Sequence, residues 1–244
     1  MRGRSAAVGA SAHAKSVLRQ PTTLAMLAVL PPFVVVLYGA AMASFPDVAF
    51  LSASAASYGR IGGALFATAF LSGLVGLFGT VSAARADRYL SFSGFSPALL
   101  FATRVVVAVG VAGLAAGVSL AALVGAGTNV ASLPRAYAVL VLAGVLYSLL
   151  GVVVGALVPR ELEGSLVLVF LADLDSFLSG GVLDVNTDLV AFLPLHYPHA
   201  LFTSAVRDGT LASETVLPAV AYLAVLAVAA GVAYAAATGR GWSL

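Results

Sequence analysis

The sequence predicts an all-α integral membrane protein, a six-transmembrane-helix bundle with both termini in the cytosol. Three observations predict this class. The 244-residue chain is 61% hydrophobic and only 9% charged, its mean hydropathy is +1.06, and six of its stretches are long enough to cross a bilayer. A soluble domain has about 25% charged residues, and a chain this apolar could not cover its own surface with polar groups.

The six predicted spans follow from length and hydropathy. A membrane helix needs about 20 mainly apolar residues to cross about 30 Å of hydrocarbon. Six segments meet this requirement: 23–44, 61–83, 99–123, 136–158, 162–183 and 216–237. Helix-breaking residues lie in the gaps, with Pro46 after the first span and Pro134 and Pro159 on either side of the fourth.

The gaps between the spans leave no room for a second domain. The longest of them, 184–215, is too short for a soluble module. We therefore expect one membrane domain, 23–244, preceded by a cytosolic N-terminal segment, 1–22. Within that segment, residues 11–20 are most simply an amphipathic helix at the membrane surface, although a cleaved signal peptide and an organellar transit peptide remain alternatives.

Basic residues near the span ends predict the topology. With the N-terminus inside, nine basic residues fall on the cytosolic side and three on the outer side. The cytosolic set is Arg2, Arg4, Lys15, Arg19, Arg85, Arg88, Arg104, Arg160 and Arg240, and the outer set is Arg60, Arg135 and Arg207. This bias predicts cytosolic termini, an outer loop at 184–215 and a multi-pass protein of the plasma membrane.

Several function classes are excluded or disfavoured. The chain has no cysteine, which excludes thiolate metal sites and cysteine nucleophiles. Residues 9–16 (GASAHAKS) resemble a phosphate-binding loop, but no strand precedes them and a membrane span follows, so we expect no nucleotide site. No intramembrane protease motif is present. The sequence thus predicts neither catalysis nor a bound cofactor or metal, and no nucleic-acid partner.

Two acids lie inside the fifth predicted span. Asp173 and Asp175 would each cost about 2.5–3.5 kcal/mol on insertion, so their presence calls for an explanation. Residues two apart on a helix point about 200° apart, so these two cannot share a face. They are either structural carboxylates, protonated or hydrogen-bonded to neighbouring hydroxyls, or part of a polar translocation path, with Asp173 about 17 Å along the helix and near the midplane.

Two histidines lie in the predicted outer loop. His196 and His199 have the spacing of metal ligands on one helix face, but Pro198 between them disfavours a helix there. A short amphipathic helix is expected over 199–208, with four apolar residues that either enter the outer leaflet or fold back into the bundle. These residues are Leu201, Phe202, Ala205 and Val206.

Pairs of glycines four residues apart occur in three of the predicted helical regions. Such pairs allow the backbones of neighbouring membrane helices to approach closely. They are Gly59/Gly63, Gly113/Gly117 and Gly151/Gly155. They predict a tightly packed bundle and nothing more specific.

The stretch 84–97 (ARADRYLSFSGFSP) lies between the second and third predicted spans. It resembles the permease subunits of ABC-2-type exporters. In that family a charged cluster follows the second span, and a short helix and a turn then lead to a basic residue that opens the third span, here Arg104. The family's E-R-x-x-G-T-L core is degenerate in this chain, where residues 86–88 (ADR) stand nearest to it. Residues 192–202 (FLPLHYPHALF) also resemble the L-P-x-x-P-x-x-L stretch of small permeases of the fluoroquinolone-export type.

The resemblance implies a transport function. Two copies would form the pathway as a homodimer, and a separate ATP-binding cassette ATPase would dock on the cytosolic loops and drive efflux of a hydrophobic or amphipathic substrate. The chain itself would be no enzyme, because the partner hydrolyses the ATP. The main alternative is a stand-alone ion- or proton-coupled transporter or channel that uses Asp173 and Asp175. An intramembrane lipid-modifying enzyme is a more distant one.

The charged stretch yields a specific coupling hypothesis. We expect Arg85, Asp87 and Arg88 to lie on its partner-facing side, where charges set docking specificity. Gly94 and Pro97 would fix the turn that returns the chain to the membrane. The alternative is an ordinary positive-inside loop with no docking role.

Overall fold

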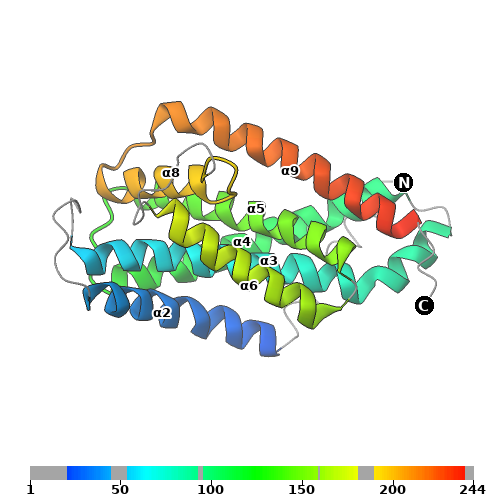
Figure 1. Ribbon diagram of the computed structural model, residues 1–244, viewed down its shortest axis with the longest axis horizontal. Coiled ribbons are helices and arrows are strands. Elements are labelled where there is room, and N and C mark those ends of the chain that lie inside the picture. Colours follow the sequence, from blue (N-terminus) through cyan, green and yellow to red (C-terminus); the bar gives the residue numbers. More distant parts are fainter. Residues whose placement is uncertain (1–20, 45–53, 93–95, 159, 181–189, 240–244) are drawn as a thin grey trace.

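The computed structural model describes residues 21–44, 54–92, 96–158, 160–180 and 190–239. These residues form helices joined by short connections, and no strand occurs among them. The helices are α2 (Pro21–Ala43), α3 (Ala55–Phe92), α4 (Pro97–Gly125), α5 (Leu133–Leu157), α6 (Glu161–Ser179), α8 (His196–Arg207) and α9 (Ser213–Gly239). The long helices run roughly along the long axis of the molecule, and the shorter α8 lies near one end of it (Figure 1). The N-terminal segment and the GASAHAKS motif lie outside the described residues.

Five of these helices are long and apolar enough to cross a membrane: α2, α3, α4, α5 and α9. The structure is therefore that of a helical membrane protein. The fifth predicted span corresponds to α6, which is shorter than expected and ends at Ser179 rather than 183. Its 19 residues include four acids, so by composition it is weaker than the other five.

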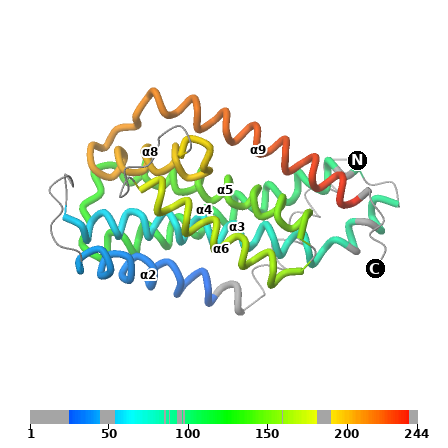
Figure 2. Tube along the Cα trace, in the orientation of Figure 1, coloured from blue at the N-terminus to red at the C-terminus, as the bar shows by residue number. Residues whose placement is uncertain are grey.

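The second span is much longer than the sequence predicted. We expected it to end at 83 and give way to a loop, but α3 continues without a break to Phe92. Its 38 residues correspond to about 57 Å at 1.5 Å per residue, nearly twice the thickness of the hydrocarbon core. The residues from Arg85 to Phe92 thus form a helical extension of the span, which can be followed past the other helices at the right of Figure 2.

Helices α3 and α5 form the core of the bundle. Their most apolar windows are 72% and 67% buried, against 11% for α9 and 22% for α2. Close approach of the two backbones requires glycine. A side chain at Gly151 of α5 would meet the backbone oxygen of Gly73 in α3, and one at Gly76 would meet the backbone oxygen of Ser148. Gly151, from one of the predicted glycine pairs, therefore lies at the tightest helix contact.

Helix α8 folds back into the bundle instead of lying in the outer leaflet. The four apolar residues identified from the sequence are all buried, and α8 packs mainly on α5, with further contacts to α9, α3 and α6. The helix begins at His196, earlier than expected, because proline is tolerated in the first turn, where no intrahelical N–H bond is lost. Gly209 follows it with φ +67°, a conformation that favours glycine.

Two ends of the bundle can now be defined. The α8 end contains α8, the α4–α5 connection, the start of α3 and the last turns of α2 and α6. The Asp87 end contains the extension of α3, the start of α4 and the last turns of α9. They lie at opposite ends of the long axis in Figure 1. Helix α3 contributes to both, with Tyr58 near its start and Asp87 near its end.

Candidate functional site

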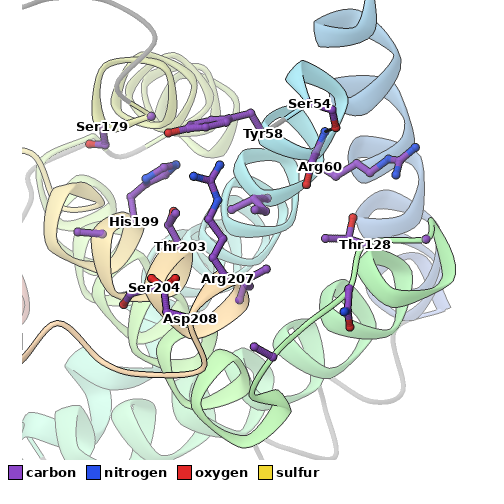
Figure 3. Close-up of a pocket in the computed structure, with 18 residues that line it drawn as sticks. Ser54, Tyr58, Arg60, Thr128, Ser179, His199, Thr203, Ser204, Arg207 and Asp208 are labelled. Atoms are coloured by element: carbon purple, nitrogen blue, oxygen red, sulfur yellow. Dashed lines mark hydrogen bonds between the residues drawn. The ribbon is translucent and has the colours of Figure 1, made fainter. Parts of the chain in front are cut away.

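The α8 end contains a cavity of about 990 Å³. Its walls come from the start of α3, the α4–α5 connection, the end of α6 and the polar face of α8 (Figure 3). Its polar and charged lining residues are Ser54, Ser57, Tyr58, Arg60, Thr128, Asn129, Ser179, His199, Thr203, Ser204, Arg207 and Asp208. This end thus offers a polar chamber inside an otherwise apolar protein.

A cation–π contact joins two walls of this polar chamber, α3 and α8. The guanidinium carbon of Arg207 lies 4.4 Å from the centre of the Tyr58 ring, and Figure 3 shows His199 beside this pair. Arg60 points away from them, toward α2. The hydroxyls of Thr128 and Thr203 are buried in the lining and have no hydrogen-bond partner among the described residues, so they are available to water or to a ligand.

A second, smaller cavity of about 240 Å³ lies between α2, α3 and α6. It shares Tyr58, Gly180 and His199 with the polar chamber. Its other lining residues are Tyr38, Ala41, Met42, Gly59, Gly62, Asp173, Ser176 and Phe177. We call it the apolar pocket, since Asp173 is the only charged residue among the described residues that line it. The α8 end therefore joins an apolar and a polar compartment through common walls.

Asp173 of the apolar pocket connects α6 to α2. Its carboxylate accepts a hydrogen bond of 2.6 Å from the hydroxyl of Tyr38, and the Tyr38 ring is in turn stacked on Phe66 of α3 at 5.5 Å. Asp173 is the thirteenth residue of the 19-residue α6. It thus lies about 9 Å from the end of that helix, closer to the α8 end than the predicted midplane position.

Asp175 is fully buried on the other side of α6. It accepts hydrogen bonds from the Tyr147 hydroxyl at 2.5 Å, the Ser179 hydroxyl at 2.9 Å and the backbone N–H of Leu195 at 3.0 Å. Because Leu195 is the residue from which α8 starts, this carboxylate fixes the start of α8 to α5 and α6. It lines neither the polar chamber nor the apolar pocket.

The two acids therefore point to different faces of α6, as their spacing predicted. The structure gives Asp175 the partners expected of a structural carboxylate, while Asp173 borders a pocket. A part for either residue in a translocation path stays a prediction. Tyr38 and Tyr147 donate these hydrogen bonds. In the sequence, each is only a polar group within an apolar span, so the sequence does not indicate these particular contacts.

The Asp87 end contains a buried ion pair. The Arg104 guanidinium of α4 binds the carboxylate of Asp87 and the backbone oxygen of Gly79, both in α3. The hydroxyl of Tyr234 in α9 donates to the same carboxylate at 2.7 Å, and the guanidinium lies 5.3 Å from the Tyr234 ring. One carboxylate thus holds α3, α4 and α9 together.

This ion pair corrects the expected orientation of Asp87. We predicted that its side chain faces a partner, but only 9% of it is exposed and Arg104 covers it. The reason is energetic, since a carboxylate buried in an apolar bundle needs an ion pair or several hydrogen bonds to be stable. Arg104 had been identified as the basic residue that opens the third span, whereas nothing in the sequence predicted the role of Tyr234.

The other predicted coupling residues are placed only by their backbones. Arg85 and Arg88 lie in the helical extension of α3, not in a loop. Pro97 stands at the first turn of α4, after Ser96 at the helix start, which is the position where proline is most favourable. Gly94 lies outside the described residues. Helix α3 ends at Phe92, and α4 begins at Pro97.

The histidines lie in the first turn of α8, which corrects the expectation that Pro198 would prevent a helix there. His199 is buried and lines both compartments. Burial, with smaller contributions from His196 and Arg207, lowers the pKa of His199 to about 4, and burial also lowers the pKa of His196. A neutral imidazole at the junction of the two compartments is therefore the resting form near neutral pH.

Comparison with known proteins adds no relative. No protein-family model matches this chain, and no curated protein sequence matches it. The resemblance to ABC-2 permeases accordingly depends on the motifs at 84–97 and 192–202 alone.

Proposed function

We propose that this chain is the permease subunit of an ABC-2-type exporter that moves a hydrophobic or amphipathic substrate and is driven by a separate ATPase. The single observation that carries the proposal is the position of α3. One helix provides Tyr58 to the walls of both compartments and Asp87 to the ion pair at the opposite end. These two residues are about 44 Å apart along the helix.

The proposal includes α6 as a sixth span. Nineteen residues extend about 28 Å, close to the thickness of the hydrocarbon core. Hydrogen bonds to Asp173 and Asp175 lower the cost of placing these acids in the membrane. With six spans and the basic residues inside, the α8 end faces out and the Asp87 end faces the cytosol.

The substrate class follows from the two connected compartments. The apolar pocket suits a hydrophobic body, and the polar chamber suits a head group that can hydrogen-bond. Because they share Tyr58, Gly180 and His199, an amphipathic molecule can contact both at once. This arrangement supports transport of an amphipathic compound over conduction of a bare ion.

The helical extension of α3 suits the coupling role. Arg85 and Arg88 would present charge to the ATPase on a rigid helix instead of a loop, so a displacement there moves the whole of α3. The Asp87–Arg104 ion pair and Tyr234 connect this end of α3 to α4 and α9. Asp87 thus acts as a positioning residue that transmits motion, not as a docking charge.

A homodimer in the plasma membrane completes the proposal. Helices α2 and α9 expose large apolar side chains, among them Phe33, Val36, Leu217 and Val225. Lipid covers such faces in a membrane, and a second copy would cover part of them where the pathway forms. The ATP-hydrolysing site would belong to the partner.

Transport by membrane vesicles tests the function. We would co-express the chain with a candidate cassette ATPase, prepare inverted vesicles and follow accumulation of a fluorescent amphipathic dye. We expect accumulation that requires ATP and both subunits. A vesicle that accumulates dye on a proton gradient alone, without ATP or the ATPase, would instead establish the ion-coupled alternative.

Cysteine labelling tests the topology separately. The native chain has no cysteine, so a single Ser204→Cys variant in α8 gives an unambiguous signal. We expect an impermeant maleimide to label it from outside intact cells and a matched Ser91→Cys variant in the α3 extension only after permeabilisation. The reverse pattern would show that the α8 end faces the cytosol and would refute the proposed orientation.

A further inference from the structure

The apolar pocket contains one carboxylate that is incompletely neutralised. Asp173 receives a single hydrogen bond, from Tyr38 to one of its oxygens, and it has no ion pair within the described part of the chain. A carboxylate has two oxygens and can accept about four hydrogen bonds. By contrast, Asp175 and Asp87 each receive several donors. Of these three acids, the exposed Asp173 has the fewest donors, and it retains the most capacity for a further positive partner.

The remaining walls of this pocket suit an organic group attached to that positive charge. Tyr38, Tyr58 and Phe177 supply aromatic rings, and Met42 supplies a flexible thioether side chain. Aromatic faces attract cations through their quadrupole, and Tyr58 already faces the guanidinium of Arg207 in this structure. A volume of about 240 Å³ lies just below the roughly 300–1,000 Å³ of sites for drug-sized ligands, so a single ring with a compact ammonium group fits.

We propose that the apolar pocket binds a lipophilic organic cation, with the ammonium group against Asp173 and the hydrocarbon part against Tyr38, Met42 and Phe177. This inference refines the proposed function and rests on it for the physiological role, because it names a substrate class. The pocket itself exists whether or not an ATPase drives the chain. Binding can therefore be measured without transport.

Equilibrium binding of a small probe pair tests the proposal. Benzyltrimethylammonium carries one ring and one compact cation, and neopentylbenzene is its neutral isostere. We would measure both on the full chain in lipid nanodiscs. We expect the cation to bind at least about tenfold more tightly than the isostere, and Asp173→Asn to remove that preference. The matched variant Glu163→Gln, at an exposed acid paired with Arg160, should leave the binding unchanged.

A second variant separates ligand binding from helix anchoring. Tyr38→Phe removes the hydrogen bond to Asp173 but keeps the carboxylate and the aromatic ring. If Asp173 binds the cation, Tyr38→Phe retains or strengthens the preference for it, even if Asp173→Asn fails to fold. If Asp173 only anchors α2, Tyr38→Phe weakens binding of cation and isostere alike, and the proposal is wrong.

Two further results would overturn it. One is a folded Asp173→Asn protein that still prefers the cation over its isostere. The other is tighter binding of phenylacetate, an anion of similar size, which would point to the arginines of the polar chamber. If the chain binds the cation but shows no ATP-driven transport, the exporter assignment is wrong and the cation site is retained.

Discussion

The two ends of the bundle differ in how their charges are used. At the Asp87 end, one acid, one arginine and one tyrosine hydroxyl satisfy each other and lock α3, α4 and α9 together. At the α8 end, two cavities remain: one contains threonine hydroxyls with no hydrogen-bond partner in the described part of the chain, and the other a carboxylate of unused capacity. The Asp87 end is held together by paired groups, and the α8 end has room for a ligand.

This difference indicates that the two ends of α3 have different roles. A contact in which several groups bind one buried carboxylate is rigid, and a rigid contact transmits displacement well. A cavity whose lining groups have unused hydrogen-bonding capacity can exchange water for a ligand at a small cost in free energy. Variants at each end should therefore have different effects.

Breaking the ion pair should have the largest effect on stability. Arg104→Met leaves Asp87 buried without its cation, and we expect a loss of about 3–5 kcal/mol in unfolding free energy. The measurement is unfolding in mixed detergent micelles. The double variant Asp87→Asn/Arg104→Met should recover at least half of this loss, because no buried charge then remains. Equal destabilisation by the single and double variants would contradict this role.

The largest effect at the α8 end should come from Asp175. Asp175→Leu leaves the hydroxyls of Tyr147 and Ser179 and the N–H of Leu195 unpaired, so we expect a loss of about 2–4 kcal/mol. Asp175→Asn keeps an acceptor and should lose about 1 kcal/mol. Maleimide labelling at a Ser204→Cys reporter should accelerate in the leucine variant as α8 loosens. A leucine variant as stable as wild type would show that this contact does not hold α8.

Acid should weaken the α8 end through His199. Its pKa is about 4 in the folded protein against about 6.5 when unfolded, so the unfolded state binds more protons. The stability contributed by the neutral imidazole is complete above pH 6.5 and is lost as the pH falls toward 4. We expect about 2 kcal/mol of this loss by pH 5.

The control for this pH effect is a variant without the imidazole. His199→Gln should show a shallower fall of unfolding free energy between pH 7 and pH 5 than wild type. The same slope in both proteins would mean that other groups determine the acid sensitivity.

The smallest effect concerns the α4–α5 connection that closes the polar chamber. Gly127 has φ +85°, and a side chain there would meet nothing within 4 Å, so only backbone strain opposes substitution. Gly127→Ala should lose about 1 kcal/mol. Gly125→Ala, two residues earlier in the last turn of α4 and equally open, should be neutral or slightly stabilising. Equal effects of the two substitutions would contradict the assigned backbone conformation.

The sequence was sufficient for elements that depend on hydropathy alone. Four predicted spans, seen as α2, α4, α5 and α9, appear as helices within about three residues of their expected bounds, and the apolar face of α8 was identified residue by residue. The end of α3 was not, because the charges of Arg85, Asp87 and Arg88 are typical of a loop after a span. A continuous helix can nevertheless contain these charges, because Arg104 and Tyr234 bind the buried carboxylate of Asp87.

The site was only partly predictable for a related reason. The spacing of Asp173 and Asp175 fixed their opposite directions, but their partners come from α2, α5 and the start of α8, distant in sequence. The cavities depend on where α8 folds back, and that depends on the Asp175–Leu195 contact. Such long-range hydrogen bonds leave no periodic pattern in the sequence.

Charge reversal on the α3 extension tests the central claim most directly. In vesicles that contain the chain and its ATPase, we would compare Arg85→Glu/Arg88→Glu with Arg160→Glu, an exposed arginine on the same predicted side. Insertion would be verified by labelling at position 204. We predict that the double variant loses both ATPase association and ATP-dependent transport, and that the Arg160 variant keeps both. Association and transport that survive the double reversal in a correctly inserted protein would contradict the permease-subunit assignment.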